Sequence, residues 1–250
     1  NRALSAEEIR YHYNRGGPVG YWKFDEGATS TAYDASGNSK NGILQDNMAT
    51  TSWVSGKYGS ALNFDGVNDF VDAAGISSST RSISFWLNRQ DSADRDIIDF
   101  GTAEIKISSN AITSSGFTSP TYYIDGAVGS TTLKTGVWQH IVITSTADVD
   151  AYNVDIGKAS TNYFSGFLDD VRIYNYARSA DEIKLDYNAG LAANFGPTSA
   201  DCGRDPGSCV TKGLVGYWSM DEGRGTTTND GSDNANHGQF AAANTSPAWT

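Results

Sequence analysis

The sequence is poor in positive charge and has no long apolar segment. Its 18 lysines and arginines are outnumbered by 29 aspartates and glutamates, which gives a formal net charge of −11 without any basic run. Nucleic-acid binding needs a clustered Lys/Arg surface, and anionic membranes attract basic segments, so both partners are disfavoured. No apolar run is long enough to span a bilayer. We therefore expect no nucleic-acid or membrane contact from this segment.

Cysteine is nearly absent. Cys202 and Cys209 are the only two, separated by residues 203–208. This spacing is not a CxxC redox pair, and no matching histidines complete a zinc site. Pro206-Gly207 between them favours a turn, so we expect a local disulfide and therefore an oxidising compartment. Two free thiols are the alternative.

Residues typical of catalysis are also scarce. The chain has three histidines and contains neither a G-x-S-x-G nucleophile motif nor a P-loop. His140 is the only histidine between residues 18 and 188, and it lies beside Trp138 in a predicted strand. We expect a half-buried side chain with satisfied polar atoms, and the alternative is a general base.

Glycine, serine, threonine, asparagine and aromatic residues are abundant, whereas charged residues make up 19% of the chain. This composition is typical of all-β extracellular modules. Apolar and polar residues alternate over 82–87, which predicts a half-buried strand, and residues 137–144 are apolar on both faces, which predicts a central strand. Asp125-Gly126 within 122–128 is a strong hairpin signal. Many such short strands predict a β-sandwich or jelly roll.

Two short helices are expected, because an S-x-x-E capping box occurs twice. The pairs are Ser5 with Glu8 and Ser179 with Glu182. Each helix is about two turns long and is marginal alone. We expect Ile183 and Tyr187 to hold the second helix against the sandwich. The first, over residues 5–13, should dock on its neighbour or fray.

Parts of the sequence occur twice. The stretch 19–27 (VGYWKFDEG) returns as 215–223 (VGYWSMDEG), an offset of 196 residues that holds without a gap through Gly42 and Gly238. Residues 1–9 likewise match 175–183. Repeats of this length indicate whole domains in tandem. We therefore expect a segment of a longer protein, with a domain tail at 1–14, a complete domain at 18–188, a linker at 189–213 and the head of a following domain at 214–250.

Seven motifs follow one another along the complete domain. They are 20–27 (GYWKFDEG), 34–38 (DASGN), 59–71 (GSALNFDGVNDFV), 82–87 (SISFWL), 123–126 (YIDG), 138–142 (WQHIV) and 169–174 (DDVRIY). In this order they resemble the LamG-type (laminin-G-like, concanavalin A-like) domains of tandem-repeat bacterial surface proteins. The resemblance implies an all-β jelly-roll β-sandwich of two antiparallel sheets, with a short C-terminal helix per domain. It also implies extracellular placement and a role in adhesion or glycan binding, but no reaction.

Six residues are candidate ligands of a structural calcium ion, the one cofactor that we expect. They are Asp25, Glu26, Asp34, Asn38, Asp169 and Asp170. Asp34-x-Ser36-x-Asn38 spaces oxygen donors as calcium loops do, and an Asx turn is an equal alternative. The resemblance makes the first and last strands neighbours, which brings Asp25-Glu26 and Asp169-Asp170 to one edge. Like charges there are costly unless a cation or hydrogen-bond donors intervene.

Four aromatic residues are candidates for ligand binding. They are Trp86, Tyr123, Trp138 and Tyr163. Trp86 and Trp138 would form a sugar-stacking platform on the concave sheet. The alternative, that they belong to the core, is favoured because large aromatic residues on central strands more often lie there. Enzymes with the fold of the resembled family carry a Glu-x-Asp-x-Glu strand, or a His, a Tyr and an Arg-rich strand, and this sequence matches neither pattern.

The sequence therefore predicts an extracellular, non-catalytic adhesion or glycan-binding module. Its expected partners are polysaccharides, other glycans or a cell-surface protein, and tandem copies would add avidity. A purely structural spacer is the second interpretation, and a polysaccharide-degrading enzyme is the third. A binder needs an exposed aromatic or polar cluster in a groove, whereas a spacer does not.

Overall fold

The computed structural model describes residues 17–46, 48, 52–188, 218, 227–229 and 236–239. The chain divides into two compact units, residues 1–189 and residues 190–250. The predicted helix over 5–13 and the predicted disulfide between Cys202 and Cys209 lie outside the described residues.

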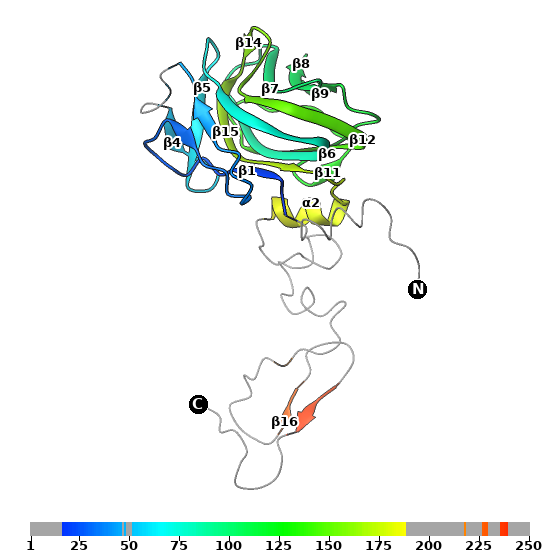
Figure 1. Ribbon diagram of the computed structural model, residues 1–250. Helices are drawn as coiled ribbons and strands as arrows, with labels where there is room; N and C mark the ends of the chain where they lie inside the picture. The colour runs from blue at the N-terminus through cyan, green and yellow to red at the C-terminus, as the bar shows by residue number, and fades with distance from the viewer. Residues whose placement is uncertain are drawn as a thin grey trace. The chain divides into compact units, whose positions relative to one another are not determined.

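The first unit consists mainly of antiparallel β-strands (Figure 1). The strands are β1 (Gly20–Trp22), β2 (Thr31–Ala32), β3 (Gly42–Leu44), β4 (Trp53–Ser55), β5 (Ser60–Asp65), β6 (Val71–Arg89), β7 (Arg95–Gly101), β8 (Glu104–Ser108), β9 (Ala111–Ser115), β10 (Thr121–Ile124), β11 (Ala127–Val128), β12 (Gln139–Ile156), β13 (Lys158–Ala159), β14 (Asn162–Tyr163) and β15 (Ser165–Tyr174). One described helix, α2 (Ala180–Tyr187), follows them. The predicted all-β character is confirmed.

The two longest strands, β6 and β12, pair along most of their length. Their register runs from Gln139 opposite Leu87 to Ile156 opposite Val71, and it shifts between Thr144 and Asn153. Such irregularities bend strands and increase their twist. The sheet, in the order β4-β5-β15-β6-β12-β7-β8-β9, accordingly curls (Figure 1). Apolar side chains from β1, β6, β7, β8, β12 and β15 form one core cluster.

Several local predictions are confirmed. Residues 141–144 of β12 lie between β6 and β10, as expected of a central strand. Ile124 pairs with Ala127 around Asp125-Gly126, whose φ angles of 53° and 75° are those of a type I′ hairpin turn. The first and last strands are antiparallel neighbours, because β1 pairs with β15 from Gly20 opposite Ile173 to Trp22 opposite Val171.

Residues 82–87 of β6 are buried on both faces, and the prediction of a half-buried strand there is wrong. Ile83, Phe85 and Leu87 point into the core, as expected. The opposite face, here called the outer face, carries Ser82, Ser84 and Trp86, of which none is more than 3% exposed. The outer face is covered because later parts of the chain pack on it, above all helix α2.

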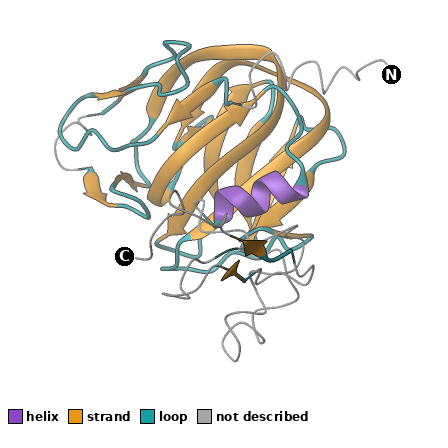
Figure 2. Cartoon of the chain, turned by 90° about the horizontal axis from the view of Figure 1, so that it is seen from below, coloured by secondary structure: helices purple, strands orange, loops and turns teal. Residues whose placement is uncertain are grey.

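Helix α2 lies across the strands (Figure 2). Its predicted capping box is present, since the Ser179 side chain accepts from the Glu182 backbone N–H and the Glu182 side chain accepts from the Ser179 N–H. Ile183 is completely buried, and the Tyr187 ring stacks on Trp86 at 5.8 Å between centroids. The predicted packing of the helix through Ile183 and Tyr187 is therefore confirmed.

The described part of the second unit contains a short hairpin. Strand β16 (Thr227–Thr228) pairs with β17 (Gly238–Gln239) in antiparallel register. Among the helices of the described residues, none combines the length and the apolar character needed to cross a membrane.

Ser179→Ala should destabilise the first unit by about 1 kcal/mol, because it removes the side-chain acceptor of the cap. Thermal unfolding measures the loss. Fraying of α2 should also make Trp86 more accessible to a fluorescence quencher. Ser179→Asp, which keeps an acceptor at the N-cap, is the matched control and should behave like the parent. Equal loss in both variants would show that the cap does not hold the helix.

Candidate functional site

An open depression of about 270 Å³ lies beside the connection from β1 to β2. Its lining residues come from the end of β1 and from the turn after β2. They are Lys23, Asp25, Glu26, Tyr33, Asp34 and Ala35. Three of the predicted calcium ligands therefore line one hollow. Tyr33, the one aromatic residue among the six lining residues, is 55% exposed.

Asp34 organises the turn below this depression. Its Oδ1 accepts hydrogen bonds from the backbone N–H groups of Tyr21 (3.0 Å) and Ser36 (2.8 Å). Its Oδ2 accepts from the N–H of Lys40 (2.9 Å) and from the Ser36 hydroxyl (2.8 Å). Burial acts to raise the pKa of Asp34, but these hydrogen bonds outweigh it and lower the pKa. This is the arrangement of the Asx-turn interpretation.

Asn38 also serves the turn. Its Nδ2 donates to the Val19 carbonyl (3.1 Å) and to Ser36 Oγ (3.0 Å). The Glu26 side chain reaches forward to the depression, where Oε1 accepts from the Tyr33 N–H at 2.8 Å. Glu26 Oε2 is buried and has no hydrogen-bond partner. The backbone of Tyr33 is thus held in place by a neighbouring carboxylate.

The predicted meeting of carboxylates from the first and last strands occurs around the loop 56–59, which joins β4 to β5. Asp25 Oδ1 accepts from the Ser60 N–H and Asp169 Oδ2 accepts from the Tyr58 N–H, both at 3.0 Å. Glycine is required at both ends of this loop. A Cβ at Gly56 would lie 2.7 Å from Asp169 Oδ2, and one at Gly59 would lie 2.1 Å from Asp25 Oδ1. Backbone donors therefore stand between the two carboxylates.

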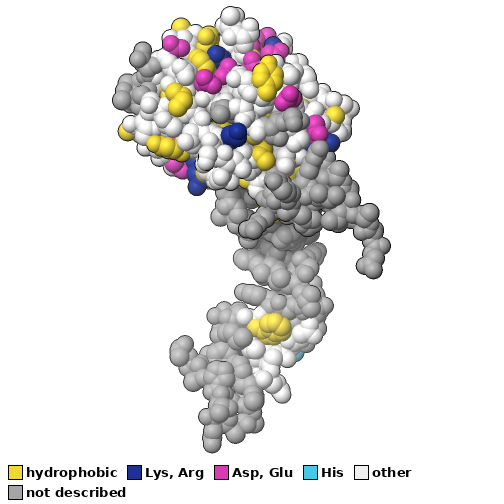
Figure 3. Space-filling view, viewed as in Figure 1, with side chains coloured by type: hydrophobic (Ala, Val, Ile, Leu, Met, Phe, Trp, Pro, Cys, Tyr) yellow, Lys and Arg dark blue, Asp and Glu magenta, His cyan; other side chains and the backbone are white. Residues whose placement is uncertain are grey.

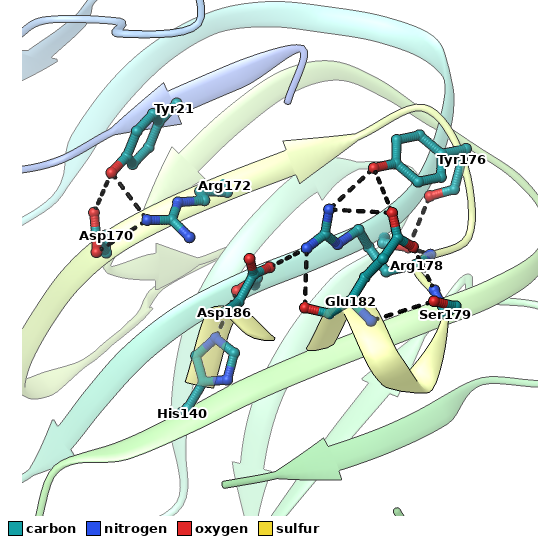
Figure 4. A network of polar contacts seen from close by, with 11 residues as sticks. Tyr21, His140, Asp170, Arg172, Tyr176, Arg178, Ser179, Glu182 and Asp186 are labelled. Carbon is teal, nitrogen blue, oxygen red and sulfur yellow. Dashed lines mark hydrogen bonds and ion pairs between the residues drawn. The ribbon is translucent and has the colours of Figure 1, made fainter. Parts of the chain in front are cut away.

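Asp170 is paired separately. It follows Asp169 at a register shift in the β15–β6 pairing and has a φ of 54°. Tyr21 donates its hydroxyl to Asp170 Oδ1 at 2.6 Å, and Arg172 Nη2 contacts both Asp170 Oδ2 (3.2 Å) and the Tyr21 hydroxyl (3.0 Å) (Figure 4). Burial, and then the hydrogen bond to Asp170, raises the pKa of Tyr21. This triad links β1 to β15.

Asp169 is the least satisfied carboxylate of the group. It is completely buried, and its Oδ1 has no hydrogen-bond partner. Burial raises the pKa of Asp169 to about 7 despite the Tyr58 N–H, and the nearby charges of Asp170 and Asp25 act in the same direction as burial. Around neutral pH the Asp169 carboxyl is therefore partly ionised, and this buried charge is unfavourable for the folded state.

A cluster of rings covers the outer face next to Asp169. Trp86 contacts the His140 ring at 5.0 Å, the Tyr58 ring edge-on at 5.7 Å and the Lys57 ammonium at 4.5 Å. Trp86 is 3% exposed, so it belongs to a packed layer, in line with the alternative that we gave for it, and offers no platform to a ligand.

His140 is buried in the same layer, deeper than the half-buried position that we predicted. Its Nε2 lies 2.9 Å from Ser84 Oγ, whereas its Nδ1 has no hydrogen-bond partner, contrary to the expectation of satisfied polar atoms. Burial, with Arg172 and Arg178 nearby, lowers its pKa to about 3. The ring is therefore neutral at ordinary pH.

Arg178 fixes the helix above this layer (Figure 4). It donates to the Glu182 carbonyl at 3.2 Å and to the Tyr176 hydroxyl at 3.0 Å, and it pairs with Asp186 of α2. Glu182 and Asp186 of α2 are thereby engaged within the fold.

The other predicted aromatic residues lie in separate contacts. Trp138 packs against Phe167 at 6.2 Å, and Tyr163 packs against Phe70 at 6.5 Å. Tyr123 is half-buried on β10, opposite Val142. No ring contact of the described residues joins these three aromatics to Trp86 or to one another.

Tyr33 and Lys23 are the lining residues that sequence reasoning missed. Neither belongs to a motif with recognisable chemistry, and a single tyrosine in a loop gives no signal of its own. In the part of the chain that the structure describes, no three His, Cys, Asp or Glu side chains converge as a metal-binding group. Calcium at the six predicted ligands stays a prediction. On the face shown in Figure 3, acidic side chains lie in several places and the lysines and arginines are few and scattered.

Comparison with known proteins gives a fold but no family. No protein-family model and no curated protein sequence matches the chain. Domain 4 of AbnA, a GH43 extracellular arabinanase from Geobacillus stearothermophilus, solved in complex with arabinotriose, matches with a TM-score of 0.50 and 16% identity, over 68% of this chain and 98% of that one. The first unit therefore has the type of β-fold found in that domain.

Two further solved structures are more distant. The receptor binding domain of botulinum neurotoxin D has a TM-score of 0.44 at 14% identity, over 72% of this chain and 55% of that one. Trypanosoma rangeli sialidase in complex with sialic acid has a TM-score of 0.47 at 11% identity, over 70% of this chain and 33% of that one. This chain spans 55% and 33% of those two structures.

Asp169→Asn should stabilise the protein at pH 8 by roughly 1–3 kcal/mol and leave it nearly unchanged at pH 4. Because the pKa of Asp169 is raised from 3.8 to about 7 on folding, its stabilising contribution is present below pH 3.8 and is lost as the pH rises to about 7. Asparagine keeps an oxygen for the Tyr58 N–H and never ionises. Chemical denaturation in calcium-free buffer at pH 4, 6 and 8 measures the difference.

His140 has the opposite dependence, because stability from a depressed histidine pKa is lost as the pH falls below 6.5. The contribution of His140 to stability is the same in the parent and in the Asp169→Asn variant, so it cancels from the difference in stability between them. The exposed Asp72→Asn, which also removes one carboxylate, is the matched control and should not reproduce the stabilisation of Asp169→Asn at pH 8. If the free energy of unfolding of Asp169→Asn changed with pH as that of the parent does, Asp169 would not carry the buried charge.

Proposed function

We propose that this chain is an extracellular, non-catalytic glycan-binding module of LamG-type jelly-roll architecture, which acts among tandem copies of the same domain. The observation that carries the proposal is the open depression with the exposed ring of Tyr33 on its wall. Sugars present apolar C–H faces and hydroxyl groups together, and they are bound by aromatic rings beside polar and charged groups.

The chemistry of the lining suits such a ligand. Tyr33 offers a ring face, Lys23 can donate hydrogen bonds to hydroxyl groups, and the Asp25 carboxylate can accept them. The surrounding turn is held by the Asp34 and Glu26 hydrogen bonds, so Tyr33 needs little further ordering when it binds. A preordered site loses less entropy on binding, which supports recognition by a small surface.

The comparison adds support at the level of fold. A domain of the same type of fold was solved with arabinotriose bound, which makes an oligosaccharide a reasonable occupant for the proposed site. Individual sites of this size are weak, and tandem copies would raise the overall affinity through avidity. Adhesion to a polysaccharide or to a glycosylated cell surface follows from the same proposal.

The absence of catalysis is part of the proposal. A retaining glycosidase needs two carboxyl groups about 5–5.5 Å apart across a sugar cleft. Two carboxylates at the depression and beside it are engaged elsewhere: Asp34 by backbone N–H groups and Asp170 by Tyr21 and Arg172. These engagements support a binding role over a polysaccharide-degrading enzyme.

A structural spacer is the second candidate. It is favoured by one observation: Trp86, one of the two residues considered for a sugar-stacking platform, is covered by Lys57, Tyr58 and Tyr187. A domain without an accessible platform on its sheet could serve only to separate other parts of a longer protein.

Tyr33→Ala should weaken glycan binding by about tenfold or more, since loss of a central aromatic contact costs more than ~1 kcal/mol. The full chain, displayed as a multimer, is tested on a polysaccharide and glycan array with calcium and then with EDTA. Tyr152→Ala is the matched control, because Tyr152 is 61% exposed on β12 and packs against Gly101 of β7.

Each outcome decides one part of the proposal. Binding that Tyr33→Ala removes and Tyr152→Ala retains supports the site, and its loss in EDTA would support the predicted calcium. Binding unaffected by Tyr33→Ala would move the site elsewhere on the domain. No binding by the parent in either buffer would favour the spacer.

A further inference from the structure

The hairpin of the second unit has the same register as a hairpin of the first. In the first unit β2 pairs with β3, with Thr31 opposite Ile43 and Ala32 opposite Gly42. In the second unit β16 pairs with β17, with Thr227 opposite Gln239 and Thr228 opposite Gly238. Each residue of the second hairpin lies 196 positions after its counterpart, which is the offset of the sequence repeat.

A long-range side-chain contact is repeated as well. The Trp22 indole N–H donates to the Lys40 carbonyl at 2.8 Å, and the Trp218 indole N–H donates to the Asn236 carbonyl at 2.9 Å. Donor and acceptor are again related by the repeat offset. The two segments therefore adopt the same local structure in both the hairpin and the position of the tryptophan.

The surroundings of the two hairpins differ. In the first unit, β3 pairs with β2 on one side and with β6 on the other, where Gly42 lies opposite Ala73 and Leu44 opposite Val71. Strands β3 and β6 approach each other so closely at this point that a Cβ on Gly42 would lie 2.5 Å from Val71 Cγ1. Trp22 is completely buried beneath this and neighbouring strands.

No such strand accompanies the second hairpin among the described residues. Within them β17 pairs with β16 alone. Among the described residues, the atoms nearest to a Cβ on Gly238 would belong to Thr228 and Trp218. The Trp218 side chain is 41% exposed, whereas Trp22 is not exposed at all. The indole that is covered in the first copy is thus partly exposed in the second, and the strand edge that pairs with β6 in the first copy has no pairing strand among the described residues of the second.

We propose that the second unit contains a strand-acceptor site, formed by the outer edge of β17 and the indole of Trp218. Its occupant is an antiparallel β-strand with the chemistry of Val71-Asp72-Ala73. The first unit defines that chemistry: Val71 and Ala73 are buried toward the tryptophan side and Asp72 is exposed. A strand added to an open edge gains main-chain hydrogen bonds, and alternate side chains give it selectivity. This site is independent of the glycan site at Tyr33.

The test uses the full 250-residue chain, labelled with ¹⁵N, and a capped peptide with the sequence of residues 67–76 (VNDFVDAAGI). Trp218→Phe identifies the indole signal of Trp218. The peptide should shift this signal and the amide signals of Gly238 and Gln239 in a saturable manner. A peptide with Val71→Pro and Asp72→Pro is the control, because proline removes the N–H groups that a β-ladder needs.

A free strand binds weakly because it loses conformational freedom, so the same ten residues are also fused to the C-terminus through a flexible Gly/Ser linker, which raises their effective concentration. The fused strand should reduce quenching of Trp218, measured as the difference from the Trp218→Phe chain. If neither form changes the Trp218 signal, or if the proline control acts like the parent peptide, the proposal is wrong.

Discussion

The pairing of β6 with β12 is the contact on which the rest of the first unit depends. The two longest strands pair along most of their length, from Gln139 opposite Leu87 to Ile156 opposite Val71. The register shifts between Thr144 and Asn153 allow the sheet to curl. Strand β15 pairs with the other side of β6, and β1 and β5 pair with β15, so the region of the depression is attached to β6 through its neighbours. Strand β6 thus holds several other strands in place, and its residues 82–87 are covered on both faces.

Covering the outer face places polar groups in an apolar layer. Ser84 and His140 satisfy each other through one hydrogen bond, while His140 Nδ1 and Asp169 Oδ1 have no partner. Both residues respond by favouring their neutral forms, since burial lowers the pKa of His140 to about 3 and raises that of Asp169 to about 7. The loop 56–59 and helix α2 are therefore held by packing against Trp86 as much as by charge.

Local chemistry made much of this fold predictable. The turn at Asp125-Gly126, the capping box of Ser179 and Glu182 and the core position of Ile83 each follow from a few adjacent residues, and each was predicted correctly. The burial of Trp86 was the favoured interpretation, but the residues that cover it, Tyr58 and Tyr187, could not be named because they are distant in the sequence. At the candidate site, Asp34 was found from its type and spacing, and Asp25 and Glu26 from the strand neighbours that the resemblance implies. Tyr33 has no such pattern, and only its exposure in the fold singles it out.

The internal repeat separates residues that build the turn from those available to a ligand. Trp22, Asp25, Glu26 and Asp34 return as Trp218, Asp221, Glu222 and Asp230, and in the first unit these residues make the hydrogen bonds that shape the turn or pack the core. Tyr33 and Lys23 return as Asn229 and Ser219. The ring of Tyr33 and the ammonium of Lys23 are not needed to hold the Trp218 contact or the β16–β17 register, since both form without them. The proposed glycan site thus depends on two side chains that the second copy of the sequence does not carry.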